Sequence, residues 1–465
     1  MSERIDATEL ARRIRDGEVS AAAVLARAQE RLERSGLNAV VATGRVEGGD
    51  GPFAGVPTVV KDLLPFPGLP ITMGCRLFQQ NIPTEALPYT EALSASGLVV
   101  LGVSASSELG LLGSTETALH GVTRNPWGPQ LSAGGSSGGA AAAVAAGLVP
   151  IAHASDGGGS IRLPAALHGL VGFKASGGAS AVATPMQSPM SALVSEGCVS
   201  WSVRDTDAYL AATAATARPL YGAADPGRLR VGVYLKDAFG RAPGRDARAA
   251  VESAAALLES LGHSVEWNDG PDLDGAAISD AFFTCAGAVL TGLEQMMAPM
   301  LGRPLQAGDV EPFTLALLER FRRRPALPEA LAQVQAQGAA LSSFLGRYDV
   351  ALSPTVGGER PRLGHLAPHL PLDVLLARTE RLAAYTAAYN MAGAPAVSLP
   401  LHVDDEGLPV GIQLGASPGQ DQVLMRLAYQ LEAAAPRAER RPPGDPGASG
   451  SDTTGISRRD PPTPG

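Results

Sequence analysis

The sequence predicts an α/β protein with a single domain, built on a large central mixed β-sheet that is covered by helices on both faces. Its 465 residues are 45% hydrophobic and 18% charged, so the chain is long enough to bury a large core. Between residues 55 and 173, short apolar runs alternate with glycine- and serine-rich loops and alanine-rich helical stretches. This alternation is typical of a sheet packed between helices.

Residues 7–34 predict two helices with one apolar face each, interrupted near Asp16 and Gly17. We expect them to brace the fold from outside, within an N-terminal segment of residues 1–40. The catalytic region is expected over residues 55–205. Its strands are predicted at residues 56–60, 98–101 and 149–152.

The longest stretch without an acidic or basic residue runs from Asn125 to Ser155 and raises the question of a membrane span. Its one helix-like run is residues 139–149, about half of the ~20 residues that a span requires. Gly, Ser and His are scattered through the stretch. The sequence therefore predicts a buried helix and no membrane segment.

The second half of the chain begins with a β-α-β unit, because two short apolar runs flank an amphipathic helix. Residues 275–348 are predicted to be mostly helical and, with residues 175–200, to line a substrate pocket. The domain is expected to span residues 1–435, since residues 436–465 contain 12 Gly or Pro and a single Ile, which predicts disorder. The predicted elements are a strand at 229–235, a helix at 247–261, and strands at 263–267, 350–352 and 396–399.

Composition and charge disfavour several classes of protein. Lys plus Arg number 37 and Asp plus Glu 46, and this net charge of -9 disfavours nucleic acid and anionic lipid as partners. The three cysteines form no C-x-x-C pair, so neither a disulfide framework nor a zinc ribbon is expected. Charges begin at the third residue, and no signal-peptide apolar segment follows. These features together predict a cytoplasmic protein.

Lysine is rare in this chain, since only three of the 37 basic residues are lysine: Lys61, Lys174 and Lys236. A buried lysine amine can lose its proton and act as a base, whereas arginine cannot. Lys61 ends a short apolar strand, which would carry its amine into the interior and favour the neutral form. A salt bridge to the adjacent Asp62 is an equal alternative.

Ser136 and Ser160 lie 24 residues apart, each within a cluster of serines and glycines. Gly157, Gly158 and Gly159 precede Ser160 and could aim successive backbone N–H groups at one point, where an anion or an oxyanion would bind. Plain turns are the alternative interpretation.

Two other glycine-rich motifs fit the sequence less well. A phosphate loop or a dinucleotide fold is disfavoured because neither cluster contains the required glycine pattern. Residues 134–138 formally match the nucleophile elbow of α/β-hydrolases, but that elbow must follow a strand, and residues 126–129 predict none.

Taken together, these segments resemble the amidase signature family, and the matching segments follow the family order from about residue 7 to 432. The resemblance implies the family's α/β fold and a hydrolase that cleaves the C–N bond of a carboxamide or lactam. The segments that carry it are residues 55–62 (GVPTVVKD), 124–127 (RNPW), 134–139 (GGSSGG), 155–174 (SDGGGSIRLPAALHGLVGFK), 202–205 (SVRD), 353–355 (SPT), 390–400 (NMAGAPAVSLP) and 407–413 (GLPVGIQ).

By this resemblance Ser160 aligns with the nucleophile, Ser136 with a bridging serine on a cis peptide bond, and Lys61 with the terminal base. The family's chemistry passes a proton from the nucleophile through the bridging serine to the lysine, and forms an acyl-enzyme that water releases. No cofactor and no metal ion are implied. The resemblance also implies an oxyanion hole at Gly157, Gly158 and Gly159 and supporting roles for Ser137, Asp156 and Arg162, with Arg162 anchoring the loop through hydrogen bonds.

Within the family, residues 51–54, 121–127, 302–305 and 309–311 are most similar to 6-aminohexanoate cyclic dimer hydrolases. By the same resemblance, Cys285 falls where that group places a cysteine in the substrate pocket. A core position in an apolar helix is the alternative.

The chain departs from the family pattern at a few positions. Residues 175–179 (ASGGA) lack the family's usual Pro and Arg, Gly157 stands where a larger residue is common, and Ala388 replaces a frequent proline. These departures leave the three candidate catalytic residues in place. They affect the loop after Lys174 and hence the shape of the substrate entrance.

Histidine chemistry is disfavoured. Pro368 separates His365 from His369, and no H-E-x-x-H motif occurs. His153 and His168 flank the Ser160 cluster and are interpreted as packed side chains.

Two rival functions stay open. The first is the A subunit of a tRNA-dependent amidotransferase, which needs partner subunits and is weakly disfavoured by the acidic charge. The second is a catalytically silent binding protein with the same fold. The expected partner is a small-molecule amide, and a homodimer is compatible with the sequence, which does not encode the oligomeric state.

Overall fold

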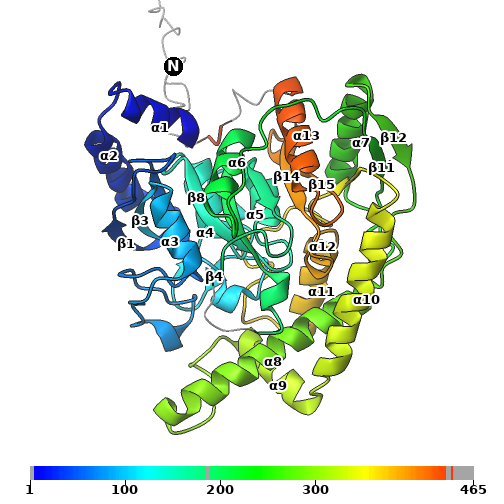
Figure 1. The fold of residues 1–465 in the computed structure, drawn as a ribbon. Helices are drawn as coiled ribbons and strands as arrows, with labels where there is room; N and C mark the ends of the chain where they lie inside the picture. Colours follow the sequence, from blue (N-terminus) through cyan, green and yellow to red (C-terminus); the bar gives the residue numbers. More distant parts are fainter. Residues whose placement is uncertain (1–4, 184–187, 436–440, 444–465) are drawn as a thin grey trace, which may run out of the picture.

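The structure is a computed structural model that describes residues 5–183, 188–435 and 441–443. Most of the predicted disordered tail therefore lies outside the described residues. The central element is an eight-stranded mixed sheet with the strand order β12-β11-β13-β15-β14-β9-β10-β8 (Figure 1). Its strands are β8 (Ile151–Asp156), β9 (Val171–Lys174), β10 (Ser195–Ser200), β11 (Arg230–Val233), β12 (Ser264–Trp267), β13 (Val350–Pro354), β14 (Ala396–Val403) and β15 (Pro409–Gly415).

The sheet is mixed, as the sequence predicts. Strand β11 pairs in parallel with β12 and with β13, which confirms the β-α-β unit. The other neighbouring strands of this sheet pair antiparallel.

A second, three-stranded sheet has the order β1-β3-β2 and lies beside β8. The hydroxyl of Thr58 in β2 donates to the carbonyl of Ile151 at 2.9 Å, which joins the two sheets at this point. The strands outside the central sheet are β1 (Val40–Val46), β2 (Pro57–Lys61), β3 (Val99–Ser104), β4 (Glu116–Thr117), β5 (Gly121–Val122), β6 (Arg124–Asn125) and β7 (Gly128–Ser132).

Helices cover both faces of the central sheet. Side chains of α6 (Val203–Ala212), α7 (Arg245–Ser260) and α13 (Asp421–Ala434) join one core cluster with the strands. Helices α4 (Gly138–Ala145) and α5 (Arg162–His168) contribute to a second cluster. Because strand side chains alternate between faces, Val350 belongs to the first core whereas Ala351 packs near Tyr389.

The N-terminal helices brace the fold as predicted. They are α1 (Ala7–Arg15) and α2 (Ala21–Arg34). The buried carboxylate of Asp205 accepts the backbone N–H groups of Ala7 and Thr8, each at 2.8 Å. These bonds satisfy free N–H groups at the start of α1, so Asp205 attaches the brace to α6.

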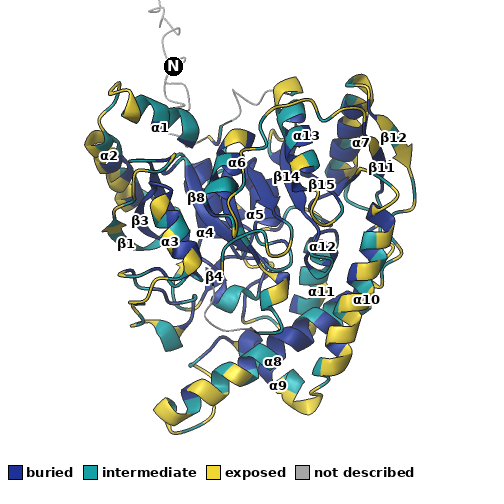
Figure 2. Ribbon diagram, in the orientation of Figure 1, coloured by how far each residue is buried: buried dark blue, intermediate teal, exposed yellow. Residues whose placement is uncertain are grey.

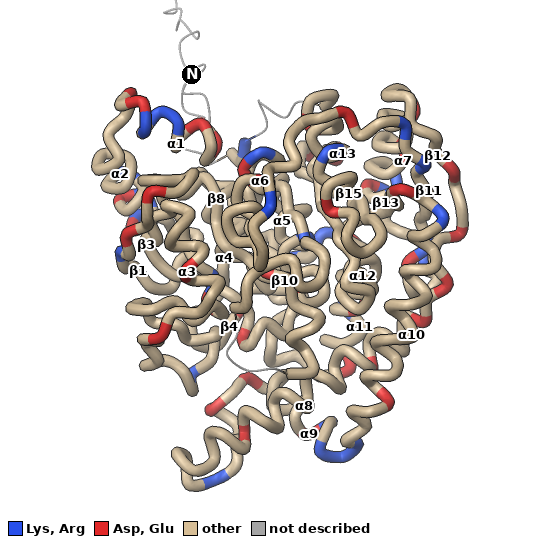
Figure 3. Tube along the Cα trace, in the orientation of Figure 1, with Lys and Arg blue, Asp and Glu red and all other residues tan. Residues whose placement is uncertain are grey.

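Helices α8 (Gly275–Leu301) and α9 (Pro312–Arg323) lie at one end of the molecule, and α10 (Leu327–Leu345) runs from there along one side (Figure 1). Figure 3 shows Lys and Arg interspersed with Asp and Glu there, and the basic run that ends α9 is paired with acids, for example Arg320 with Asp280 at 2.5 Å. The remaining helices are α3 (Pro88–Ala95), α11 (Leu372–Leu382) and α12 (Ala387–Met391), with 3-10 turns at Arg76–Phe78, Glu108–Gly110 and Ser191–Leu193.

Helix α8 is the one helix in the described part of the chain with the length and hydropathy to cross a membrane. It packs against α9 and α10, and most of its buried residues lie between Gly275 and Leu290, whereas its C-terminal end is largely exposed (Figure 2). Phe283 and Leu290 of α8 belong to the same core cluster as Phe313 of α9. In this structure α8 is a core helix for much of its length.

Two predicted boundaries differ from the structure. The strand predicted at residues 149–152 is β8, which begins at Ile151 and runs to Asp156. Hydropathy misses the end of this strand because Ser155 and Asp156 are polar, although both are buried and hydrogen-bonded. The prediction of no strand at residues 126–129 is also wrong, since β7 begins at Gly128. Pro129 is tolerated because it is itself exposed and β7 belongs to a two-stranded ribbon, where one edge needs no donor.

Candidate active site

Lys61 is the last residue of β2, and its side chain is fully buried. The amine Nζ lies 2.8 Å from Oγ of Ser136, 3.0 Å from Oγ of Ser155 and 3.1 Å from the Ser155 carbonyl oxygen. The predicted alternative, a salt bridge to Asp62, does not form. Asp62 instead accepts hydrogen bonds from the backbone N–H groups of residues 72–74 and from the Thr72 hydroxyl.

Burial lowers the pKa of Lys61 to about 7, because desolvation penalises the charged amine. Glu196 and Asp156 oppose this shift through their negative charge, but neither contacts the amine. A substantial fraction of the amine is therefore neutral near pH 7. A neutral amine with a serine hydroxyl at 2.8 Å can accept its proton.

His153 positions the backbone of Lys61. Its Nδ1 accepts the Lys61 N–H at 3.1 Å, so the ring proton must reside on Nε2, which donates to Glu196 at 2.9 Å. His153 and His168 are both buried and hydrogen-bonded within the core, which confirms that they are packed side chains.

Ser136 follows a cis peptide bond between Gly135 and Ser136, as expected. It lies two residues before α4, whose first two residues are glycines. A Cβ at Gly138 would come within 2.3 Å of the Thr115 hydroxyl, and one at Gly139 within 2.4 Å of the Ala105 nitrogen. The glycines thus let α4 start against β3 and the following loop, which holds Ser136 beside Lys61.

The loop before Ser160 is organised by Asp156, the last residue of β8. Its carboxylate accepts the Gly159 N–H at 2.6 Å, the Ile161 N–H at 3.2 Å, and two bonds from Arg162 at 2.9 and 3.0 Å. Although burial opposes ionisation, Arg162 and Asn390 hold the pKa of Asp156 well below its usual range. The loop is therefore fixed around a buried, ionised carboxylate.

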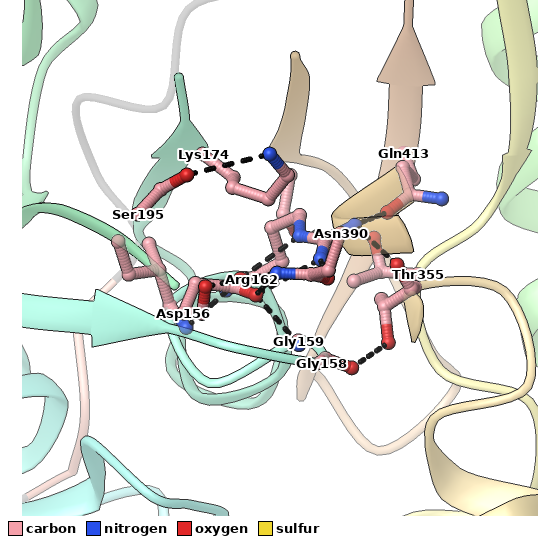
Figure 4. A network of polar contacts seen from close by, with 12 residues as sticks. Asp156, Gly158, Gly159, Arg162, Lys174, Ser195, Thr355, Asn390 and Gln413 are labelled. Atoms are coloured by element: carbon pink, nitrogen blue, oxygen red, sulfur yellow. Dashed lines mark hydrogen bonds and ion pairs between the residues drawn. The ribbon is translucent and has the colours of Figure 1, made fainter. Parts of the chain in front are cut away.

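Arg162 links this loop to the C-terminal part of the chain (Figure 4). Its Nη1 donates to the Gln413 side chain at 2.9 Å and to the Thr386 carbonyl at 3.0 Å, while Nη2 donates to Asn390 at 2.6 Å. The predicted anchoring of the loop by Arg162 hydrogen bonds is thus what the structure shows.

The predicted set of oxyanion-hole donors needs one correction. The Gly159 N–H is bonded to Asp156, and Gly159 does not line the cavity, so this group is not available to a ligand. Within the described residues, the N–H groups of Gly157, Gly158 and Ser160 donate to no protein acceptor, and all three residues line the cavity. The prediction included Gly159 because the sequence could not show which N–H turns toward Asp156.

Ser136 and Ser160 both line a cavity of about 570 Å³. Its wall is mostly apolar and comes mainly from α8, residues 109–113, the loop at residues 188–194, and the end of α11 with the segment that follows it. Helices α9 and α10 contribute no lining residue among those described, so the prediction that residues 275–348 as a whole line the pocket is wrong. Only α8 does so, because α9 and α10 pack on its far side.

Cys285 is fully buried and packs with Ala281 of α8, Ala330 of α10 and the partly buried Met391. It is absent from the cavity lining, whereas its neighbours Phe282 and Ala286 are part of it. Cys285 therefore occupies a core position, which was the alternative prediction, and does not line the cavity. Cys285 and Ala286 are one position apart, and one position along a helix turns a side chain by about 100°, so the two face different sides of α8.

Two site residues were missed from the sequence. The Ser155 hydroxyl contacts the Lys61 amine, and the Thr386 hydroxyl donates to the Gly158 carbonyl at 2.6 Å. Thr386 belongs to an alanine-rich segment without a motif, so no local signal marks it. The predicted supporting residue Ser137 donates to the Ser155 carbonyl at 3.3 Å.

The other two lysines differ sharply in environment. Lys174 is buried beside this network and donates to the Ala175 carbonyl at 2.9 Å and toward Ser195 at 3.4 Å (Figure 4). Burial lowers its pKa to about 7. Lys236 forms an exposed pair with Asp269 at 2.6 Å. Of the three amines, only that of Lys61 contacts a serine of the cavity.

Comparison with known proteins gives consistent matches. The profile of the amidase family matches residues 18–425. "Putative amidase AmiC" of Mycobacterium tuberculosis is 34% identical over 453 residues, covering 93% of this chain and 95% of that protein. The 6-aminohexanoate-cyclic-dimer hydrolase of Pseudomonas sp. is 32% identical over 477 residues, covering 94% and 96%. The solved structure of a 6-aminohexanoate cyclic dimer hydrolase complexed with substrate superposes with a TM-score of 0.86 at 30% identity, covering 95% of this chain and 99% of that one.

Proposed function

The chain belongs to the amidase family, and we propose that it hydrolyses amide C–N bonds with Ser160 as nucleophile, Ser136 as proton relay and Lys61 as base. The observation that carries this proposal is the buried amine of Lys61, 2.8 Å from the Ser136 hydroxyl. Ser136 in turn lines the same cavity as Ser160. A buried lysine that contacts no carboxylate is better suited to act as a base than as a structural cation.

In the first step, neutral Lys61 accepts the proton of Ser136, and Ser136 takes the proton of Ser160. The Ser160 oxygen then attacks the amide carbonyl and forms a tetrahedral oxyanion. The proton returns from the lysine through Ser136 to the leaving nitrogen, the C–N bond breaks, and the acyl group stays on Ser160. Water, activated by the same relay, releases the acid and restores the enzyme.

The free N–H groups at Gly157, Gly158 and Ser160 are the candidates for binding the oxyanion. Their loop is held by Asp156 and Arg162, so the donors need little reorganisation when charge develops. Losing one such donor typically costs about 3 kcal/mol of transition-state stabilisation. Asp156 thus has a positioning role in this proposal, and does not touch the reacting atoms.

The cavity suits an amide with apolar groups on either side of the scissile bond, because its wall is mostly apolar. Substrates like the 6-aminohexanoate cyclic dimer fall within this class. The reaction that we propose needs no cofactor. We further propose that the enzyme acts in the cytoplasm as a protein without nucleic-acid or membrane partners.

The test is hydrolysis by the purified chain alone of an aliphatic amide, an aryl amide, a cyclic diamide and glutamine. We expect turnover on at least one, lost in Ser160→Ala and kept in the control Ser260→Ala, a serine at the exposed end of α7. Turnover that survives Ser160→Ala would refute the nucleophile assignment.

A serine-reactive fluorophosphonate separates the rival functions. Labelling of Ser160 without turnover would favour a partner-dependent amidotransferase subunit, in which the serine is reactive but the substrate is missing. Neither labelling nor turnover would favour a silent binding protein.

A further inference from the structure

Glu380 is the only residue with a charged side chain among the described residues that line the cavity. It lies near the end of α11, which packs against α8 (Figure 1). Its carboxylate accepts the hydroxyl of Ser279 at 2.6 Å and forms no ion pair with any described residue. A carboxylate with a single neutral donor in a mostly apolar cavity has unused hydrogen-bonding capacity.

Two arginines lie near Glu380, but both are engaged elsewhere. Asp237 binds Nε of Arg241 at 2.8 Å and Nη1 of Arg381 at 3.1 Å. Arg241 reaches Glu380 only at its backbone carbonyl, at 3.3 Å. The two cations and Asp237 therefore form their own cluster, and the Glu380 carboxylate is left to face the cavity with Ser279.

Glu380 is close to the nucleophile loop rather than at a remote part of the cavity. Its partner Ser279 lies one turn before Phe282 on α8, and Cβ atoms one turn apart are about 5–6 Å from each other. The Phe282 ring packs on Gly158, where a Cβ would come within 3.2 Å of it. A group bound by Glu380 would thus sit a short chain away from a carbonyl at Ser160.

The neighbouring Thr379 is another polar residue of the same wall. Its hydroxyl is buried, has no hydrogen-bond partner among the described residues, and belongs to a residue that lines the same cavity. Successive side chains of a helix point about 100° apart, so this hydroxyl is a separate polar group of the wall and does not share a ligand atom with Glu380.

We propose that Glu380 binds a primary ammonium group of the substrate. The preferred substrates are then amides whose acyl part carries a protonated amine a short aliphatic chain away from the scissile carbonyl. The proposal rests on the proposed amidase function. The apolar wall fits the aliphatic chain of such a substrate. Its ammonium group would form a charge-assisted hydrogen bond with the Glu380 carboxylate, which water does not fully screen in the cavity.

The experiment compares 6-aminohexanamide with hexanamide, and 4-aminobutanamide with butanamide, on the purified full-length chain. We expect kcat/KM for at least one amine-bearing amide to exceed that for its neutral partner by about tenfold or more, mainly through KM. In Glu380→Gln the ratio falls to near one. The matched control Glu319→Gln, an exposed acid of α9, keeps the wild-type ratio.

A charge reversal tests the same site in the opposite sense. Glu380→Lys should prefer adipamic acid, which carries a carboxylate in place of the amine, over 6-aminohexanamide. Thermal melting of each variant is measured beside the kinetics, so that loss of fold is not mistaken for loss of specificity.

The outcomes separate the two proposals. Protection of Ser160 from fluorophosphonate measures binding even when turnover is slow, and 6-aminohexanamide must protect better than hexanamide. Equal protection and equal kcat/KM in the wild type, or an unchanged preference in Glu380→Gln, would refute the role of Glu380 while the amidase function stands. Failure of Ser160 to react with fluorophosphonate would instead refute the proposed function.

Discussion

The protonation of Lys61 is expected to control the reactivity of Ser160. Burial lowers its pKa from the usual lysine value of 10.5 to about 7, which corresponds to about 5 kcal/mol in favour of the neutral amine. At pH 7 about half of the molecules then carry a neutral amine, against about one in 3000 for an exposed lysine. Folding therefore raises the population of competent base about a thousandfold.

The assay is the rate at which a fluorophosphonate labels Ser160 between pH 5.5 and pH 9. We expect a rate that rises with pH and levels off, with a midpoint near the Lys61 pKa of about 7. Lys61→Ala should lower the plateau by roughly 10²- to 10⁴-fold, the usual contribution of a general base. Unfolding by circular dichroism serves as the control for an intact fold.

A change at Glu196 should shift the midpoint of the labelling rate in a direction that a purely structural role of Lys61 would not produce. The negative charge of Glu196 raises the Lys61 pKa, so Glu196→Gln removes a favourable interaction with the charged amine and should move the midpoint to lower pH. The amide oxygen of the glutamine can still accept the His153 Nε2–H. A labelling rate independent of pH, or a midpoint that moves upward in Glu196→Gln, would refute the role of Lys61 as the base.

Three further predictions concern stability. Arg162→Leu leaves the buried carboxylate of Asp156 without its cation and should lower the free energy of unfolding, measured in urea, by about 3–5 kcal/mol. Adding Asp156→Asn removes the unpaired charge and should recover part of this loss. A double variant as unstable as Arg162→Leu would contradict a charge effect. Burial and then the charge of Glu108 raise the pKa of Glu311 to about 8, so the folded state holds a proton that the unfolded state loses. The free energy of unfolding should therefore fall as the pH rises from about 4.5 to 8, by up to about 1.4 kcal/mol per pH unit. Urea titrations at several pH values measure this dependence, and Glu311→Gln should make it weaker. Gly139→Ala places a Cβ within 2.4 Å of a backbone nitrogen and should destabilise the fold by about 1–3 kcal/mol; an unchanged thermal midpoint would show that α4 can shift at no cost.

Local patterns were enough for much of the fold. The run PTVVK is apolar, β-branched and followed by turn residues, so it indicates a strand that ends at Lys61 wherever it lies in the fold. The glycines and alanines of α4 likewise predict a buried helix. The resemblance to a family added the order of the segments, and with it the pairing of Lys61 with Ser136 that the structure places at 2.8 Å.

Tertiary structure alone decided the features that depend on partners far along the chain. Asp156 takes the N–H of Gly159 because Arg162 and Asn390 fix its orientation, and Asn390 lies 234 residues away in sequence. Glu380 faces the cavity because α11 packs on α8, where Ser279 meets it. No local sequence pattern predicts either of these orientations. The sequence by itself determined which elements form and which side chains can react, since these depend on neighbouring residues. Hydrogen bonds and burial between distant segments decided which N–H groups, carboxylates and apolar faces a substrate would meet.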